Sequence, residues 1–330
     1  MMRAIGALAL AGILAAALGR RRKGTLRILR ISRVVADLDR AEAFYRDGLG
    51  FQRMARGPGD PAVAALLGLA GATSEEVVMR LGAEEIALVR FDPPGAPYPP
   101  DSRSDDLWFQ HLAVVVDDME AAYRHLSAQS PRPISTDGPA RLPPSNGSVT
   151  AFKFRDPDGH PLELIQFPPG QGRAVWHDAG ARIGPGPFLG IDHSALAVGA
   201  TPRSLRFYRR LGFRVAARSW NDSPAQSRLD GLPGARVRVT SLRPRSPTGP
   251  GLELLGYVPP GRPAPATAAN AVLTDWVTLL VPGLQGGVAL SSRQAAVHRD
   301  PDRHIMLLTD RISGNEARAR SALRRPPVDR

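Results

Sequence analysis

The feature that most constrains the fold is an internal repeat. Four segments of the 330-residue chain begin with a similar strand-like pattern of apolar residues, and a polar side chain stands near the start of each: Arg30, His111, His193 and Asp275. These positions are 111 − 30 = 81, 193 − 111 = 82 and 275 − 193 = 82 residues apart. So constant a spacing indicates one supersecondary unit used four times.

The first three copies continue from the strand into a predicted amphipathic helix. Asp37 and Asp118 stand where an N-cap carboxylate accepts hydrogen bonds from the first free amides of a helix. In the third copy we expect Thr201 to be the cap and Pro202 the first helical residue, where no amide donor is needed. Apolar residues then recur at helical spacing, which predicts one buried stripe per helix.

Each copy closes with another strand-like run, at residues 86–91, 162–167, 252–257 and 306–308. Proline and glycine in the turn at residues 156–161 predict a tight reversal before the second of these runs. The fourth copy is short, because Asp275 to Leu307 is 307 − 275 = 32 residues, against 163 − 111 = 52 in the second copy. We therefore expect a reduced fourth module without the usual helix.

The composition narrows the chemistry. The chain has no cysteine, so thiol catalysis, disulfides and cysteine-ligated zinc are excluded, and any metal must be held by His, Asp, Glu or water. The formal net charge is +12, but the only lysines are Lys23 and Lys153, and most of the arginines are scattered along the chain. We interpret this as a general arginine bias and predict no nucleic-acid partner, while attraction of anionic substrates stays open.

The N-terminal segment, residues 1–25, begins with an apolar run. Residues 4–19 are shorter than the ~20 residues that a membrane-spanning helix needs. They resemble the core of a signal peptide, although the basic cluster at residues 20–23 disfavours export of the downstream chain. Three interpretations stay open: an exported protein, a membrane tether through residues 4–19, or a cytoplasmic protein with a mis-assigned start. Oligomeric state has no sequence signal here.

The repeated motifs resemble the vicinal-oxygen-chelate (VOC) superfamily of glyoxalases, bleomycin resistance proteins and extradiol dioxygenases. Two runs carry the resemblance: the Phe-Tyr and Leu-Gly-Phe helix motif in copies one and three, and the Asp-Pro-Asp-Gly-His-Pro-Leu-Glu-Leu strand at residues 156–164. The resemblance implies an α+β fold of four tandem βαβββ modules paired into two curved-sheet cups. We place VOC domain 1 at residues 26–168, a linker at 169–187, VOC domain 2 at 188–310 with an eroded fourth module, and a basic tail at 311–330.

The resemblance further implies that metal ligands come from the first and last strands of each module. In the N-terminal half these positions hold Arg30, Ala87, His111 and Glu163. His111 and Glu163 make a second possible metal site or, alternatively, a hydrogen-bonded pair lining an empty pocket. Arg30 is a candidate for binding a substrate carboxylate through two parallel hydrogen bonds.

In the C-terminal half the same positions hold His193, Glu253, Asp275 and Leu307. We expect His193, Glu253 and Asp275 to bind one divalent metal ion, with Fe²⁺ or Mn²⁺ favoured by the two carboxylates. Glu253 is also the candidate catalytic residue, because a glutamate beside the metal can move a proton.

Two polar residues between the helix and the last strand of module three, Asn221 and Gln226, are candidate substrate-binding residues.

These features support two functions. The first is a metal-dependent enzyme acting on a small molecule with adjacent oxygens, either as a lyase or isomerase or as a ring-cleaving dioxygenase. The second is a non-catalytic protein that sequesters a small molecule, as bleomycin resistance proteins do. The incomplete ligand set of the N-terminal half favours the second function, and the C-terminal ligand set favours the first.

Overall fold

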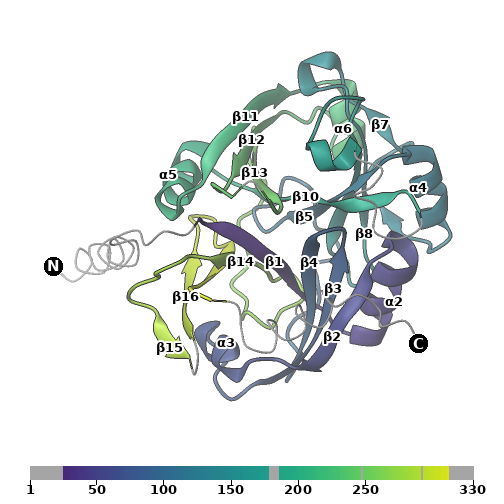
Figure 1. Ribbon diagram of the computed structural model, residues 1–330. Coiled ribbons are helices and arrows are strands. Elements are labelled where there is room, and N and C mark those ends of the chain that lie inside the picture. The colour runs from purple at the N-terminus through teal and green to yellow at the C-terminus, as the bar shows by residue number, and fades with distance from the viewer. Residues whose placement is uncertain (1–24, 178–185, 247, 291–292, 312–330) are drawn as a thin grey trace, which may run out of the picture.

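Two strongly curved sheets make up the molecule, one above the other in Figure 1. The computed structural model describes residues 25–177, 186–246, 248–290 and 293–311. The segments at 1–24 and 312–330 lie outside these residues. They include the predicted tether or signal peptide and nearly all of the predicted basic tail. Among the described residues, no helix is both long and apolar enough to cross a bilayer.

The first sheet, sheet A, has eight strands within the described residues. In spatial order they are β15 (Val288–Leu290), β16 (Arg293–Arg299), β17 (Ile305–Thr309), β14 (Asp275–Leu280), β1 (Arg27–Val34), β4 (Glu84–Asp92), β3 (Thr73–Leu81) and β2 (Gln52–Pro58). Its middle is an antiparallel pair, β1 with β14, and each of these two strands also pairs in parallel with the closing strand of its own module.

The second sheet, sheet B, repeats this plan. Its strands are β11 (Arg214–Asn221), β12 (Val237–Arg243), β13 (Gly251–Tyr257), β10 (Phe188–Ala197), β5 (Gln110–Val116), β9 (Pro161–Gln166), β8 (Thr150–Arg155) and β6 (Arg132–Pro133), with β7 (Ala140–Arg141) beside β8. The antiparallel pair in its middle is β5 with β10.

The expected architecture of four modules in two cups is confirmed, but the expected pairing of consecutive modules is wrong. Sheet A combines modules one and four, and sheet B combines modules two and three. Residues 26–168 and 188–310 therefore each contribute to both sheets. Modules one and two contact each other through a helix and a turn, as do modules three and four. Their first strands pair instead with a module from the other half of the chain.

The helices begin and end where local chemistry predicts. Helix α2 (Leu38–Leu49) is capped by Asp37, whose side chain accepts a hydrogen bond from the amide of Arg40, and it ends at Gly50 with φ of 73°. That left-handed conformation suits glycine, which has no Cβ to clash. Helix α4 (Met119–Ser127) is capped by Asp118 in the same way.

The remaining helices show one correction. Helix α5 (Thr201–Leu211) starts at Thr201 itself, after Ala200, and has no side-chain cap, so the prediction of Thr201 as the cap was wrong by one residue. Two short helices, α3 (Pro61–Leu66) and α6 (Pro224–Asp230), cover the ends of the two cups. Single 3₁₀ turns lie at Pro144–Asn146 and Ala174–His177. Residues 281–287 of module four form no helix between β14 and β15, as expected, and β15 pairs with β16 as β2 pairs with β3 in module one.

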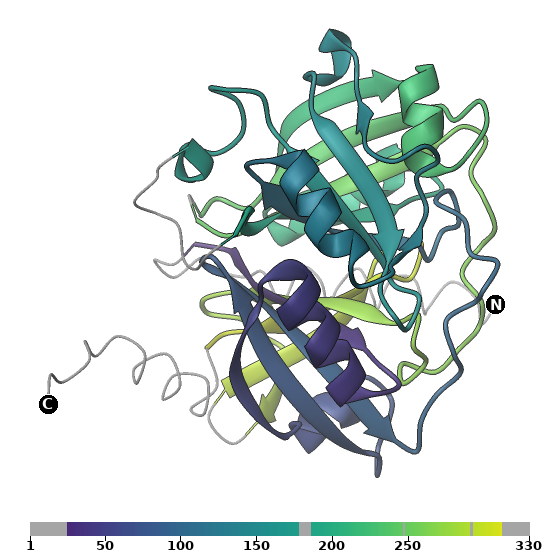
Figure 2. The same cartoon turned by 90° about the vertical axis from the view of Figure 1, so that its right-hand side faces the viewer.

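The main hydrophobic core lies between the sheets and under the helices. Alternate residues of the central strands, such as Ile31, Val114, Leu196 and Val277, are fully or almost fully buried in it. Helices α2 and α4 lie side by side on this layer, as Figure 2 shows, and Gly48 allows their close approach. Because side chains alternate along a strand, the remaining residues of these strands point into the two cups.

Candidate metal centre

The strand register of sheet B brings two histidines and two glutamates to one cup. Strands β5 and β10 run antiparallel, with His111 opposite Ala195 and His193 opposite Ala113. The same two alanines lie beside the glutamates of the closing strands: Ala113 pairs with Glu163, and Ala195 pairs with Glu253. All four side chains therefore leave their strands on the same face.

The side chains converge on a buried point. His111 Nε2 lies 2.9 Å from Glu163 Oε2, and His193 Nε2 lies 3.7 Å from the same oxygen. One ligand atom from each of these three residues lies within 4.8 Å of the others. Glu253 Oε2 is 3.5 Å from His193 Nε2. The two ligand pairs that the sequence placed in separate halves thus form one site, shared between modules two and three.

The chemistry of these groups fits a divalent cation. The Nε2 atoms of His111 and His193 are buried and make no aligned hydrogen bond with the described residues, despite the 2.9 Å contact of His111 with a carboxylate. A buried polar atom without a partner costs about 1–3 kcal/mol. Two imidazoles and two carboxylates are a ligand set for first-row transition metals such as Fe²⁺, Mn²⁺, Ni²⁺ or Zn²⁺.

The two histidines differ in protonation. Burial lowers the pKa of His111 to about 4, with Glu163 opposing the shift, so its imidazole is neutral at pH 7. Burial also disfavours the charged form of His193, but Glu253, Asp192 and Glu163 together outweigh burial and raise its pKa to about 9. His193 therefore carries a proton that a metal ion would have to displace.

Outer residues hold these side chains in place. Asp192 Oδ2 accepts a hydrogen bond from His193 Nδ1 at 3.0 Å, and Arg243 binds the other oxygen of Asp192 at 2.7 Å. This arrangement leaves His193 Nε2 facing the cup, as a carboxylate partner does for metal-binding histidines. Ser241 donates a hydrogen bond to Glu253 Oε1, which leaves Oε2 directed at His193.

Sequence reasoning missed Lys153, which lies on β8 directly opposite Glu163. Its ammonium group is buried and lies 2.7 Å from Asp230 Oδ1. Burial raises the pKa of Glu163, but His111, Lys153 and His193 outweigh burial and lower it to about 2. Glu163 is therefore ionised over the whole physiological range. The signal in the sequence was the rarity of lysine, since Lys153 is one of two in the chain.

The candidate substrate-binding residues of module three belong to a chain of hydrogen bonds that ends at Asp230. Asn221 Nδ2 donates to Gln226 Oε1 at 2.9 Å, and Gln226 Nε2 donates to Asp230 Oδ2 at 2.8 Å. Both residues are buried. The structure shows them supporting the Asp230–Lys153 pair, and their contact with a substrate stays a prediction.

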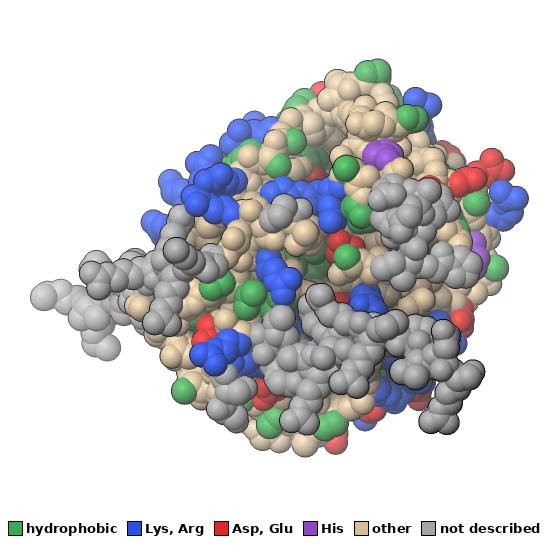
Figure 3. Space-filling model, in the orientation of Figure 1, with side chains coloured by type: hydrophobic (Ala, Val, Ile, Leu, Met, Phe, Trp, Pro, Cys, Tyr) green, Lys and Arg blue, Asp and Glu red, His purple; other side chains and the backbone are tan. Residues whose placement is uncertain are grey.

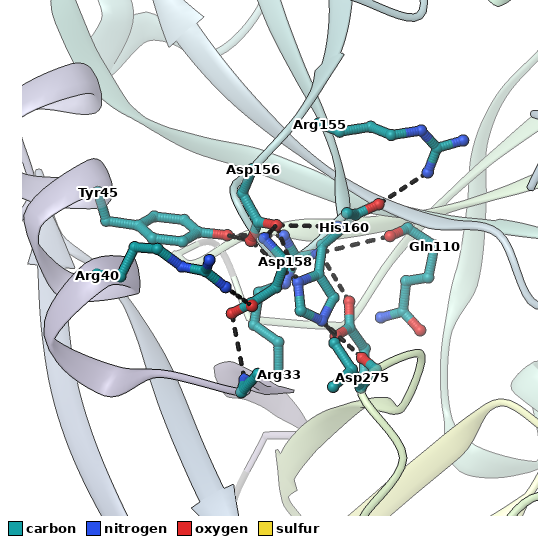
Figure 4. Close-up of polar contacts among 12 residues, drawn as sticks. Arg33, Arg40, Tyr45, Gln110, Arg155, Asp156, Asp158, His160 and Asp275 are labelled. Carbon is teal, nitrogen blue, oxygen red and sulfur yellow. Dashed lines mark hydrogen bonds and ion pairs between the residues drawn. The ribbon is translucent and has the colours of Figure 1, made fainter. Parts of the chain in front are cut away.

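The prediction of Asp275 as a partner of His193 and Glu253 was wrong. Asp275 lies in sheet A, where its carboxylate binds the fully buried guanidinium of Arg33 at 2.7 Å (Figure 4). The register aligns Ser32 with Trp276, so Trp276 and not Asp275 is the counterpart of His193. A shift of one residue along a strand reverses the face to which a side chain points.

The cup of sheet A carries different groups at the four equivalent positions. They hold Arg30, Ala87, Trp276 and Leu307, so no carboxylate or imidazole stands there. Arg30 therefore lies in the other cup, apart from the histidine cluster. Its expected role as a substrate ligand beside His111 and Glu163 does not fit this placement.

Basic residues gather on the outer face of helix α5 and strand β11, at the edge of sheet B, where Figure 3 shows arginine side chains side by side. Helix α5 contributes Arg203, Arg206, Arg209 and Arg210, all exposed, and contains no acidic residue. A surface with many like charges and few opposite ones attracts counter-ions from solution.

Comparisons with known proteins agree with this architecture. Residues 27–164 match the family model of the Glyoxalase/Bleomycin resistance protein/Dioxygenase superfamily. Glyoxalase I from Zea mays superposes with a TM-score of 0.57 at 18% sequence identity, over 87% of this chain and 92% of that chain. A putative dioxygenase from Bacillus subtilis superposes with a TM-score of 0.56 at 13% identity, over 87% and 86% of the two chains. The comparison with curated protein sequences yields no match. At these identities the superpositions show a shared fold.

Proposed function

We propose that this chain is a metal-dependent VOC enzyme. Its residues 27–164 match the superfamily model, and its fold resembles that of glyoxalase I over 87% of the chain. One observation carries the proposal. Two buried imidazoles and two carboxylates, contributed by the first and last strands of two modules, converge in the cup of sheet B. The substrate class is a small molecule with two neighbouring oxygens.

His111, Glu163 and His193 would hold the metal ion, with Glu253 beside it. When bound, the ion supplies Lewis acidity that polarises neighbouring substrate oxygens. His111 is already neutral and Glu163 already ionised, so both are ready to bind a cation. Asp192 and Arg243 keep the ring of His193 oriented.

Glu253 is the residue best placed to move a proton. Its side chain is 20% exposed, against 8% for Glu163, so it faces the open side of the cup. A general base must reach the substrate within hydrogen-bond distance, and a substrate would enter from the open side of the cup. Ser241 fixes one of its oxygens and leaves the other free to accept the proton.

The ligand set favours a lyase or isomerase over a ring-cleaving dioxygenase. Oxygenase sites of the two-histidine, one-carboxylate type keep open positions for dioxygen. Here a second carboxylate occupies the cup, and proton transfer beside a polarised carbonyl is the chemistry that uses it.

The first test is the metal itself. The full chain is purified without chelator, and bound Mn, Fe, Ni and Zn are measured, along with the variants His193→Ala, Glu163→Gln and Asp275→Asn. We expect about one ion per chain in the wild type and in Asp275→Asn, and loss of the ion in the other two. A chain that binds no ion even after metal addition would exclude the proposal.

The second test is proton transfer. The metal-loaded protein is incubated in D₂O with a panel of 2-hydroxy carbonyl compounds, and deuterium entry at the carbon beside the carbonyl is followed by NMR. Glu253→Gln should abolish exchange while keeping its metal. Exchange that survives in Glu253→Gln would assign the proton to another group.

A further inference from the structure

A well-formed cavity lies in the other cup, away from the histidines. It encloses about 400 Å³ on the concave face of sheet A. Its walls are mostly apolar and include Val63, Val78, Val89, Phe91, Trp276 and Leu307. The charged residues of the lining are Arg30, Asp60, Glu76, Glu85 and Arg293. Cavities of about 300–1,000 Å³ are typical of sites for small organic molecules.

The cavity occupies the place that the metal ligands occupy in sheet B. Among its four equivalent residues, Trp276 and Leu307 replace a histidine and a glutamate with an aromatic and an aliphatic side chain. Helix α3 closes one side, and the ion pair of Asp60 with Arg293, 2.8 Å apart, joins this helix to strand β16. The cup therefore has an enclosed apolar interior without metal chemistry at those positions.

Two hydroxyl groups point to a ligand. Ser32 and Thr278 line the cavity and are only 2% and 5% exposed. No hydrogen bond to either hydroxyl occurs within the described part of the chain. Because both residues line the cavity, their hydroxyls are available to pair with a hydrogen-bonding molecule that the cavity receives. Arg30 lies on the same face, opposite Thr278 across the β1–β14 pair.

We propose that the cavity of sheet A is a second, metal-independent binding site for an aromatic-sized apolar molecule that bears a carbonyl oxygen. The apolar body lies against Trp276, Phe91 and Leu307. The oxygen accepts hydrogen bonds from Ser32 and Thr278 at the end of the cavity where Arg30 stands. A ketone and a carboxylate share this chemistry.

The experiment measures binding by calorimetry on the full chain in EDTA, with 2-naphthoate, 2-acetonaphthone and naphthalene-2-methylamine as probes. We expect the two carbonyl compounds to bind and the amine to bind more weakly. Thr278→Val removes one hydroxyl at nearly constant volume and should weaken both carbonyl probes about five- to tenfold. Leu307→Trp narrows the cavity beside Trp276 and should weaken the binding of both about tenfold or more.

A matched control separates the two cups. His193→Ala should leave the affinity for both carbonyl probes unchanged, and Leu307→Trp should keep the metal ion of sheet B. Circular dichroism and the melting temperature establish that each variant is folded. The proposal is overturned if neither carbonyl probe binds the wild type, if Leu307→Trp binds them as tightly as the wild type does, or if His193→Ala loses them. None of these results depends on the metal content, so the proposal of a metal-dependent enzyme is tested separately.

Discussion

Tyr45 in helix α2 donates its phenolic hydrogen to Asp156 Oδ2, 3.1 Å away in the closing turn of the next module (Figure 4). The same bond recurs between Tyr208 in helix α5 and Asp300 Oδ2, at 3.0 Å. The Phe-Tyr motif of each odd module thus binds the Asp-Pro-Asp turn of the following one. Two motifs that are distant in sequence thus form one contact. This contact joins module one to module two, and module three to module four, across the two sheets.

Replacing Tyr45 with phenylalanine should destabilise the protein more than the same change at Tyr208. Tyr45 Oη also accepts a hydrogen bond from Arg33 Nη1 at 2.8 Å, so the change leaves two buried charged groups short of a partner. We expect a loss of about 2–3 kcal/mol for Tyr45→Phe and about 1 kcal/mol for Tyr208→Phe, measured by urea unfolding. Equal losses would show that Arg33 gains little from the tyrosine.

Asp275→Asn should lower stability without changing metal content. Asp275 is the carboxylate that neutralises Arg33, and removing one member of a buried ion pair costs about 3–5 kcal/mol. The matched control is the double variant Arg33→Leu with Asp275→Asn, because Leu196 stands at the position of Arg33 in module three. The double variant should unfold at a higher urea concentration than Asp275→Asn alone. The opposite order would mean that Arg33 tolerates the loss of its counter-charge.

Metal binding should release about one proton near neutral pH. His193, with a pKa raised to about 9, is charged at pH 7, whereas His111, with a pKa of about 4, is not. A metal ion must displace the proton of His193, so its affinity should rise about tenfold per pH unit between pH 7 and 9. Calorimetric titration with Mn²⁺ in buffers of different ionisation enthalpy counts the proton. A count near zero would mean that His193 is neutral before the metal arrives.

Acid should weaken the contact between modules one and two. Burial raises the pKa of Asp156, but His160 and Arg33 outweigh burial and lower it from 3.8 to about 2. A carboxyl whose pKa is lower in the folded state stabilises the protein above its unfolded value and loses that contribution as the pH falls. Asp156 should therefore contribute about 2 kcal/mol at pH 5 that disappears between pH 4 and 2. Urea unfolding across this range measures the contribution as the difference between the wild type and Asp156→Asn in how the free energy of unfolding depends on pH.

His160 changes the stability with pH in the opposite direction. Burial lowers its pKa, but the charge and hydrogen bond of Asp156 outweigh burial and raise it. Its stabilising contribution is complete below the unfolded pKa of about 6.5 and is lost as the pH rises through the higher folded value. Both contributions should be smaller in Asp156→Asn, since His160 then keeps only the more distant carboxylate of Asp275, 3.9 Å away.

The repeat was predictable from the sequence because its signals are local. Caps such as Asp37 and Asp118 and the alternating closing strands act within a few residues. The pairing of modules was not predictable, because it depends on strands almost 250 residues apart, Arg33 with Asp275 among them. The same limit explains the misplacement of Asp275: an apolar strand looks alike in either register, and one residue decides which side chain enters the cup.

The candidate metal residues show both sides of this limit. His111, Glu163, His193 and Glu253 stand at equivalent places in modules two and three, and the repeat was enough to select them. The rarity of lysine draws attention to Lys153 but does not predict its partner, which is Asp230 on helix α6, 77 residues later in the chain. A single lysine in a strand gives no sign of which acid it meets.

Because β5 pairs with β10, the candidate metal donors come from both halves of the chain, and neither half contains the complete set. His111 and Glu163 precede the interdomain linker, while His193 and Glu253 lie beyond it. A protein cut at this linker would expose two incomplete donor pairs on open sheet edges, and only reassociation of the fragments would restore the cup. Assembly of the candidate centre therefore requires modules two and three together, and a product that ends before Glu253 would lack one of its four residues.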